Sequence, residues 1–176
     1  MQSIKPIVLW MTGLSGAGKS TIAYALEEKL QKEGVLCEVL DGDVLRSGIN
    51  SNLGFTEADR IENIRRAAEV AKLLIQNNFV VICSLITPTE NLREIAKTVL
   101  GSEYKLIYIS TPLDVCKERD VKGLYKKAIK GDIQHFTGIS APFDKPELAD
   151  LTIDTHNQTE TQSVDVLYAF LRNLTK

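Results

Sequence analysis

A glycine-rich segment at residues 13–20, with the sequence GLSGAGKS, has the spacing most specific for chemistry in this chain. It fits the pattern G-x-x-x-x-G-K-[ST], in which a curled backbone points several N–H groups at the phosphates of a nucleotide. An apolar run at residues 7–11 precedes it and a helix-forming run follows it. A strand, a glycine turn and a helix N-terminus favour a phosphate site over a glycine-rich turn with a surface lysine. Lys19 is then expected to reach the β- and γ-phosphates, and the Ser20 hydroxyl to bind Mg²⁺.

Asp43 is the second candidate for chemistry, because Asp41-Gly42-Asp43 closes the apolar run at residues 35–40. Ligands of parallel sheets bind beyond the carboxyl ends of the strands, so Asp43 is expected close to the phosphate loop. A carboxylate there can hold Mg²⁺ or accept a proton from an attacking hydroxyl. The alternative is that Asp43 caps a short helix that follows.

Three arginines, Arg60, Arg65 and Arg66, lie early in a predicted helix. Arg60 and Asn63 could share one side with Phe55 near the end of the second strand. Arginine suits bidentate contact with sulfate or phosphate oxygens, although an arginine-rich helix face is often only solvated.

Residues 120–146 interrupt the regular pattern with many charges and several glycines, which predicts a functional loop or lid rather than a core element. Phe136 and Phe143 could stack on a nucleobase there, or they could tether the segment to the core. Neither His135 nor His156 has the spacing of a metal ligand.

The elements that must position these candidates are apolar, β-branched runs, which alternate along the chain with helical patterns. The alternation predicts a single α/β domain over residues 1–176, with a five-stranded parallel sheet, helices on both faces and a lid at about 120–146. The clearest helix signals are Thr56 with Asp59, which resembles a capping box, and the pair Asn77-Asn78 at the other end. We expect strands near 7–12, 35–40, 79–86, 104–110 and 151–153, and helices near 19–33, 57–77, 90–99, 113–119 and 162–173.

The composition of the 176 residues agrees with one globular domain, with 44% hydrophobic and 25% charged residues. A net charge of −2 provides no basic field for nucleic acid, and the apolar runs are too short to cross a membrane. No room for a signal peptide precedes the first strand, and we expect a cytoplasmic protein. Cys37, Cys83 and Cys116 lack metal-site spacing and are expected to be buried thiols.

Beyond these patterns, the chain resembles the adenylylsulfate kinase (APS kinase) family of P-loop kinases. The resemblance covers nearly the whole chain in the family's order. The stretch from Gly54 to Arg66 and the lid motif are specific to this family, whereas the phosphate loop occurs in many others. The matching segments are residues 13–20, 40–46, 53–66, 119–128 and 136–139.

The resemblance implies transfer of a phosphoryl group from ATP to the ribose 3′-hydroxyl of adenosine 5′-phosphosulfate, with Mg²⁺ held by Ser20 and Asp43. It implies a small-molecule substrate, and the family is commonly dimeric. Catalytic roles fall on Lys19, Asp43, Lys122 and Thr87. Nucleotide contacts fall on Gly13, Leu14, Ser15, Gly16, Ala17, Gly18, Lys19, Ser20, Thr21, Arg119 and Gln158. Acceptor contacts fall on Asp43, Arg46, Phe55, Arg60, Asn63, Ile86, Thr87, Lys122, His135 and Phe136.

Three positions depart from the family pattern. Val44 replaces an asparagine, Thr87 a serine and Thr89 an aromatic residue. All three lie on the acceptor side, so they leave open a kinase of the same fold that acts on another nucleotide-linked anion, such as a nucleoside diphosphoramidate. A nucleotide sensor without catalysis is a further alternative, although Lys19, Ser20 and Asp43 are all present.

Overall fold

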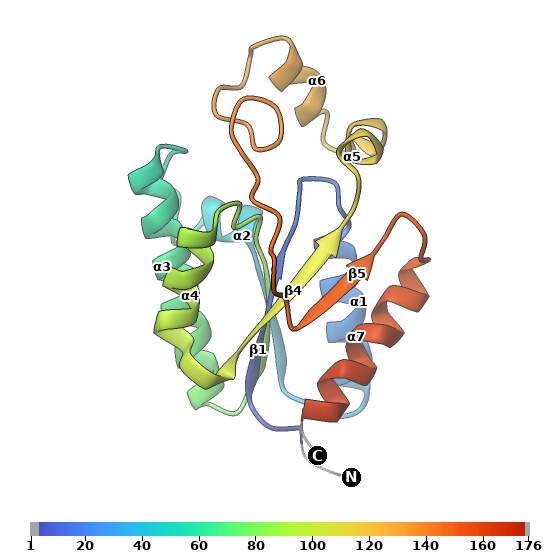
Figure 1. Ribbon diagram of the computed structural model, residues 1–176. Helices are drawn as coiled ribbons and strands as arrows, with labels where there is room; N and C mark the ends of the chain where they lie inside the picture. Colours follow the sequence, from blue (N-terminus) through green and yellow to red (C-terminus); the bar gives the residue numbers. More distant parts are fainter. Residues whose placement is uncertain (1–3, 175–176) are drawn as a thin grey trace.

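The computed structural model describes residues 4–174, which form one five-stranded sheet with helices on both faces (Figure 1). All strand pairs are parallel, and the strand order is β2-β3-β1-β4-β5. This confirms the predicted sheet and its α/β class. The strands are β1 Ile7–Thr12, β2 Cys37–Asp41, β3 Val80–Ser84, β4 Tyr104–Ser110 and β5 Leu151–Asp154.

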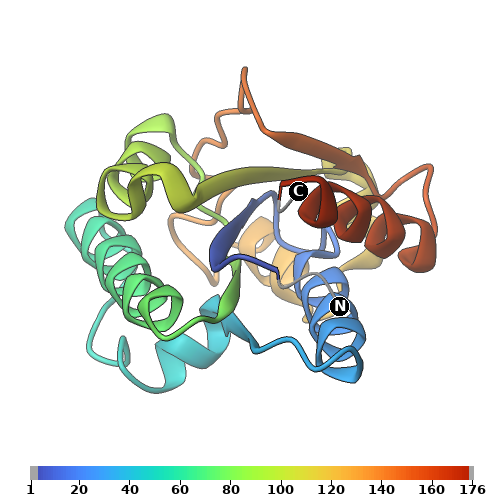
Figure 2. The same cartoon turned by 90° about the horizontal axis from the view of Figure 1, so that it is seen from below.

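The helices are α1 Lys19–Lys32, α2 Gly42–Ser47, α3 Glu57–Gln76, α4 Glu90–Leu100, α5 Leu113–Arg119, α6 Leu124–Ile129 and α7 Glu160–Leu174. A short 3₁₀ turn, Gly101–Glu103, leads into β4. Figure 2 shows α1 and α7 on one side of the sheet and α3 and α4 on the other. Within residues 4–174 no helix is long and apolar enough to span a bilayer.

Strand β1 supplies side chains to both cores because successive residues of a strand point to opposite faces. Leu9 and Met11 pack with the buried faces of α1 and α7. Val8 and Trp10 pack with α3 and α4, where the Trp10 ring lies 6.0 Å from that of Tyr104. The central strand is therefore buried on both faces, as its nearly continuous apolar sequence predicts.

The start of α3 is confirmed, since the Thr56 hydroxyl accepts a hydrogen bond from the Asp59 N–H at 3.2 Å. The start of α7 lies two residues before the expected position. There the Thr159 hydroxyl accepts from the Gln162 N–H at 3.2 Å and the Gln162 side chain accepts from the Thr159 N–H at 2.9 Å, which is a complete capping box.

Two predicted strands differ from the structure by two residues at one end. The second strand begins at Cys37 rather than at Val35, because the Val35 N–H is held in the turn after α1 by the Leu30 carbonyl at 3.0 Å. The third strand ends at Ser84, and the chain then turns away toward Thr87, which has a φ of 41°.

Residues 120–146, which we call the lid, lie above the carboxyl ends of the strands (Figure 1). They contain α6, which the sequence analysis did not predict. Its first turn depends on Asp120, whose carboxylate accepts hydrogen bonds from the N–H groups of Tyr125 and Lys126 at 2.9 and 3.1 Å. At its other end, the lid is tied to the body by a hydrogen bond from the Asp144 N–H to the Pro88 carbonyl at 2.8 Å.

The three cysteines are free and buried, as expected. Burial raises the pKa of the Cys37 thiol to about 12 and also raises the pKa of Cys83 and Cys116. A thiol with a raised pKa is a poor nucleophile, so these side chains act as small apolar core residues.

Candidate active site

A cavity of about 730 Å³ lies between the carboxyl ends of the strands and the lid. Parallel α/β sheets place their ligands at this edge. Most of the predicted site residues line it, although they come from distant parts of the chain. Those are Ser15, Gly16, Gly18, Lys19, Ser20, Thr21, Asp43, Arg46, Phe55, Arg60, Asn63, Ile86, Thr87, Arg119, Lys122, His135, Phe136 and Gln158.

The phosphate loop connects β1 to α1 in a conformation that depends on glycine. Gly13 has a φ of 152°, and a Cβ atom there would lie 2.6 Å from the Ile109 carbonyl oxygen. Gly18 has a φ of 100° at the N-cap of α1. The predicted residues Gly13, Leu14 and Ala17 do not line the cavity, and both side chains among them are buried in the core. Any contact they make with phosphate would therefore be through the main chain.

Lys19 is buried, and its ammonium group folds back onto the loop. Its Nζ donates hydrogen bonds to the carbonyls of Gly13 at 2.9 Å and Leu14 at 2.8 Å. Burial lowers the pKa of Lys19 to about 8, because removal from water penalises the charged form. An anion at this loop would supply the compensating charge.

Asp41, which the sequence analysis did not select, is the carboxylate closest to the phosphate-loop hydroxyl. Ser20 Oγ donates to Asp41 Oδ2 at 2.5 Å and lies 3.1 Å from Ser84 Oγ. Asp41 also caps α2, since its Oδ1 accepts from the Asp43 N–H at 2.9 Å. The idea that Asp43 is this cap is therefore wrong. The sequence signal that could have identified Asp41 is its position at the end of a strand, directly before the glycine that begins α2.

Asp43 is the second residue of α2 and reaches toward the lid instead. Its carboxylate forms an ion pair with the Lys122 ammonium, and both side chains are largely exposed to the cavity opening. The pair joins the body of the molecule to the lid. It also brings together two groups that the sequence analysis expected at the reacting atoms.

Phe55 and two arginines form one end of the cavity. The Arg46 guanidinium lies 4.3 Å from the centre of the Phe55 ring, and that of Arg60 lies 5.8 Å from it. Asn63 lies beside them and accepts a hydrogen bond from Asn50 Nδ2 at 3.1 Å. This end can offer an aromatic face and two positive charges to a nucleotide with an anionic group.

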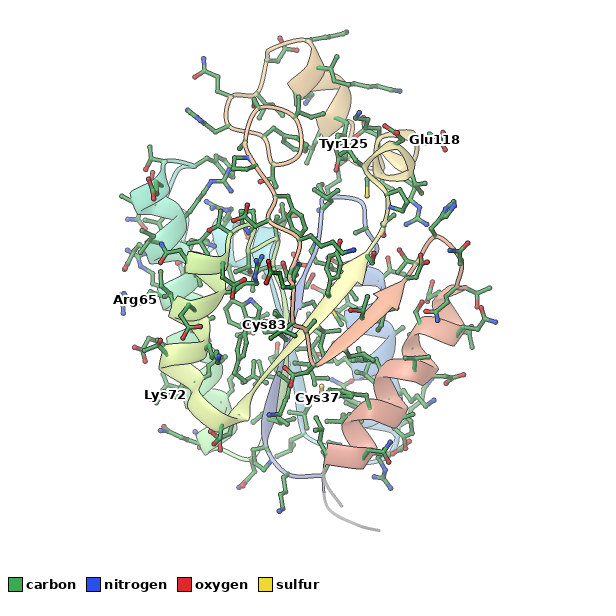
Figure 3. All side chains as sticks on the ribbon, in the orientation of Figure 1. Cys37, Arg65, Lys72, Cys83, Glu118 and Tyr125 are labelled. Carbon is green, nitrogen blue, oxygen red and sulfur yellow. The ribbon has the colours of Figure 1, made fainter. Side chains whose placement is uncertain are left out.

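Arg65 and Arg66 do not line the cavity. Both bind Glu62, at 2.7 and 2.8 Å, and Figure 3 shows Arg65 directed away from the molecule. For Arg65 the solvated-face alternative is correct. Arg66 is instead partly buried and ties α3 to the preceding loop, because it donates to the Ile49 carbonyl at 3.0 Å and to Asn52 at 2.8 Å.

Thr87 is held rigidly at the floor of the cavity. Its hydroxyl accepts from the Trp10 indole N–H at 3.0 Å, and its carbonyl accepts from Thr12 and from the buried Arg93, both at 3.2 Å. Thr89 caps α4, where its hydroxyl accepts from the Leu92 N–H at 3.5 Å. A capping hydroxyl thus gives a local reason for threonine at this position.

The lid contributes His135 and Phe136 to the cavity. The His135 carbonyl accepts from the Arg60 guanidinium at 2.7 Å, which fastens the lid to α3. The Phe136 ring lies edge-on to Tyr125 at 5.0 Å. Phe143 instead stacks on Tyr108 at 6.2 Å and does not line this cavity, so it is a tether.

The opposite end of the cavity is formed by Arg119, Thr155 and Gln158. Arg119 donates to the Thr155 carbonyl at 2.7 Å, and the Thr155 hydroxyl donates to the Ala17 carbonyl of the phosphate loop at 2.8 Å. Gln158 Oε1 is buried without a hydrogen-bond partner within the described residues. A buried polar atom of this kind is suited to a ligand that supplies the missing partner.

Comparison with known proteins gives consistent matches. The family model for adenylylsulphate kinase matches residues 5–154. The adenylyl-sulfate kinase of Bacteroides thetaiotaomicron is 54% identical over 162 residues, covering 92% of this chain and 81% of that protein. The adenylyl-sulfate kinase of Paraburkholderia xenovorans is 50% identical over 171 residues, covering 97% of this chain and 96% of that protein.

Solved structures agree with these matches. The APS kinase CysC of Mycobacterium tuberculosis, in complex with AMPPNP and APS, has a TM-score of 0.92 and 40% identity, covering 96% of this chain and 98% of that one. A shikimate kinase from Aquifex aeolicus, with a TM-score of 0.54 and 17% identity, shares only the fold. The cavity thus lies in a fold shared with kinases of several small molecules.

Proposed function

This chain belongs to the adenylylsulphate kinase family, and we propose that it transfers the γ-phosphoryl group of ATP to the ribose 3′-hydroxyl of adenosine 5′-phosphosulfate. The observation that carries the proposal is the arrangement of one cavity. A phosphate loop lies at its centre, an aromatic and arginine-rich end faces an acceptor, and Asp43 with Lys122 lies at its opening.

The reaction forms one bond and breaks one. The acceptor oxygen attacks the γ-phosphorus, and the bond from that phosphorus to the β,γ-bridging oxygen breaks, leaving ADP. We propose that Asp43 accepts or orients the proton of the 3′-hydroxyl, because it is an exposed carboxylate at the cavity opening, paired with Lys122. Lys122, released from this pair, is then free to neutralise charge on the transferred group.

For the nucleotide, we propose that the main chain of residues 13–20 and the Lys19 ammonium bind the phosphates. Arg119 and Gln158 would contact the adenine, because they form the end of the cavity beyond Thr155. For the acceptor, Phe55 and Phe136 would enclose the second adenine, and Arg46, Arg60 and Asn63 would contact the ribose and sulfate. Ile86, Thr87 and His135 would complete the pocket.

The donors around Ser20 fit Mg²⁺, which prefers hydroxyl and carboxylate oxygens. Ser20 and Asp43 are the residues proposed to hold it, and Asp41 is close enough to Ser20 to assist. Within residues 4–174 no group of three His, Cys, Asp or Glu side chains could hold an ion by itself. The ion is therefore expected to be shared with the nucleotide, where it would offset phosphate charge.

We also propose a cytoplasmic homodimer. The location follows from the need for ATP. The dimer follows from the family, which is commonly dimeric, and exposed apolar side chains such as Ile49 at 55% and Leu73 at 62% are candidates for its interface. Sedimentation velocity at several protein concentrations would measure the assembly state directly.

The function is tested by coupled measurement of ADP release with a panel of acceptors. Rapid turnover with adenosine 5′-phosphosulfate, and slow turnover with nucleoside diphosphoramidates, is the expected result. A faster rate with a nucleoside diphosphoramidate would mean that the changes at Val44, Thr87 and Thr89 have altered the acceptor. A lack of turnover with every acceptor would favour a sensor.

A further inference from the structure

Tyr125 is a lid residue with no assigned role in either substrate site. It lies in the first turn of α6 and is only 1% exposed. Figure 3 labels it where the lid meets α5. Its backbone position is fixed, because its N–H donates to the Asp120 carboxylate at 2.9 Å. The side chain therefore points into the molecule from a stable helix start.

The hydroxyl of Tyr125 reaches the phosphate loop. It donates a hydrogen bond to the main-chain carbonyl of Ser15 at 2.9 Å. Burial raises the pKa of Tyr125 well above its usual value, so the hydroxyl keeps its proton and remains a donor. Ser15 lines the cavity and belongs to the loop that would bind the phosphates of ATP. The position of this carbonyl thus depends on a residue of the lid.

The ring of Tyr125 contacts the acceptor side. Its centre lies 5.0 Å from that of Phe136 at an interplanar angle of 79°, which is an edge-to-face contact. Phe136 lines the same cavity. One buried side chain therefore contacts an aromatic wall of the acceptor pocket with its ring and the phosphate loop with its hydroxyl.

We propose that Tyr125 is a positioning residue that couples the two substrates. An acceptor base against Phe136 then favours the arrangement of the Ser15 loop that binds the nucleotide. In the same way, bound ATP favours the position of the Phe136 ring that binds the acceptor. This inference rests on the proposed function. Coupling between two ligands is reciprocal, so each must strengthen the binding of the other by the same factor.

The test is calorimetric binding of AMPPNP to the full chain, with and without saturating adenosine 5′-phosphosulfate. Without the substitution, the acceptor should tighten AMPPNP binding by about 5-fold or more, the lower end of ordinary coupling. Tyr125→Phe keeps the ring and removes only the hydroxyl. It should lower this factor toward 1, by about 3-fold or more, which is the size expected for one hydrogen bond, and should change binding of either ligand alone much less.

Tyr168→Phe is the matched control. It also removes a tyrosine hydroxyl that donates to one acceptor group, here the Glu33 carboxylate at 2.8 and 2.9 Å, but it lies on α7 and does not line the cavity. It should leave the coupling factor unchanged. Phe136→Leu provides a second route, because it removes the ring contact while keeping the Tyr125 hydroxyl. It should also lower the factor, and the double variant should lose little more.

An unchanged coupling factor in Tyr125→Phe would overturn the inference, as would an absence of coupling in the unsubstituted chain, and either result would leave the kinase function intact. Failure of adenosine 5′-phosphosulfate to bind the unsubstituted chain, alone or with AMPPNP, would instead overturn the proposed function and this inference with it. A Tyr125 that only fills the core would lower thermal stability without changing the coupling factor.

Discussion

Two aspartates separated by one glycine have different environments at the end of β2. Asp41 is buried and accepts hydrogen bonds from the Ser20 hydroxyl and the Asp43 N–H, so its position is fixed. Asp43 is largely exposed, and its carboxylate pairs with a lysine of the lid. A fixed carboxylate suits the support of a metal site, whereas a carboxylate paired with an exposed lysine can exchange that partner for a substrate hydroxyl.

Replacement of Asp43 by alanine should therefore affect the chemical step. If Asp43 orients the hydroxyl, kcat should fall by at least about 100-fold, the usual scale for a positioned base. ATP binding should largely survive because the proposed phosphate contacts are the main chain of residues 13–20 and Lys19, and Ser20 and Asp41 remain beside the metal site. Asp165→Ala is the control, since it also removes an ion-paired carboxylate, at the remote Lys29. A kcat near that of the control would refute the role of Asp43.

The buried Lys19 predicts a pH dependence of nucleotide binding. Because burial lowers its pKa to about 8, the ammonium of the free enzyme is charged below this pH and becomes neutral above it. Only the charged form attracts phosphate, so kcat/KM for ATP should fall as the pH rises above about 8. In Lys19→Arg, activity is expected to be lower, but this alkaline fall should disappear because a guanidinium stays charged. The same fall in both proteins would assign it to another group.

At the scale of elements, features that depend on local sequence signals were predicted, whereas features that depend on tertiary contacts were not. The start of α3 was predicted because Thr56 and Asp59 make the cap between themselves. Helix α6 was not predicted, because its six residues depend on Asp120 and on burial of Tyr125 against the body. The hydrogen bond from Arg60 to the His135 carbonyl, which fastens the lid to α3, joins residues 75 positions apart, so no local sequence pattern could predict it.

The cap of α3 should matter to the acceptor site as well as to stability. Thr56→Ala removes the hydroxyl that binds the Asp59 N–H and should lower the free energy of unfolding by about 1 kcal/mol. Since Phe55 and Arg60 flank this cap, KM for the acceptor should rise while KM for ATP stays constant. Urea unfolding and steady-state kinetics measure the two effects, and Thr56→Ser should restore both. An unchanged KM for the acceptor, together with the lower stability, would mean that the cap serves stability alone.

At the scale of the molecule, two cores share one sheet. Their side chains alternate along β1, so Leu9 belongs to the core under α1 and α7 while Trp10 belongs to the core under α3 and α4. The alternating pattern predicted the parallel sheet, but the sequence analysis did not predict the strand order β2-β3-β1-β4-β5. That order depends on which strand edges form hydrogen bonds with each other and on which helices cover the two faces, which only the assembled chain decides.

Because β1 is common to both cores, we predict that they unfold together as one domain over residues 1–176. Trp10, the only tryptophan, and Cys83 report on one core, and Cys37 reports on the other. In variants that retain a single cysteine, either Cys37 or Cys83, the thiol should become reactive at the same urea concentration at which Trp10 fluorescence and far-UV circular dichroism change. If the Cys37 thiol reacted at a clearly lower urea concentration than Cys83, the core under α1 and α7 would open first. The shared strand would then be too weak a connection to make the domain cooperative.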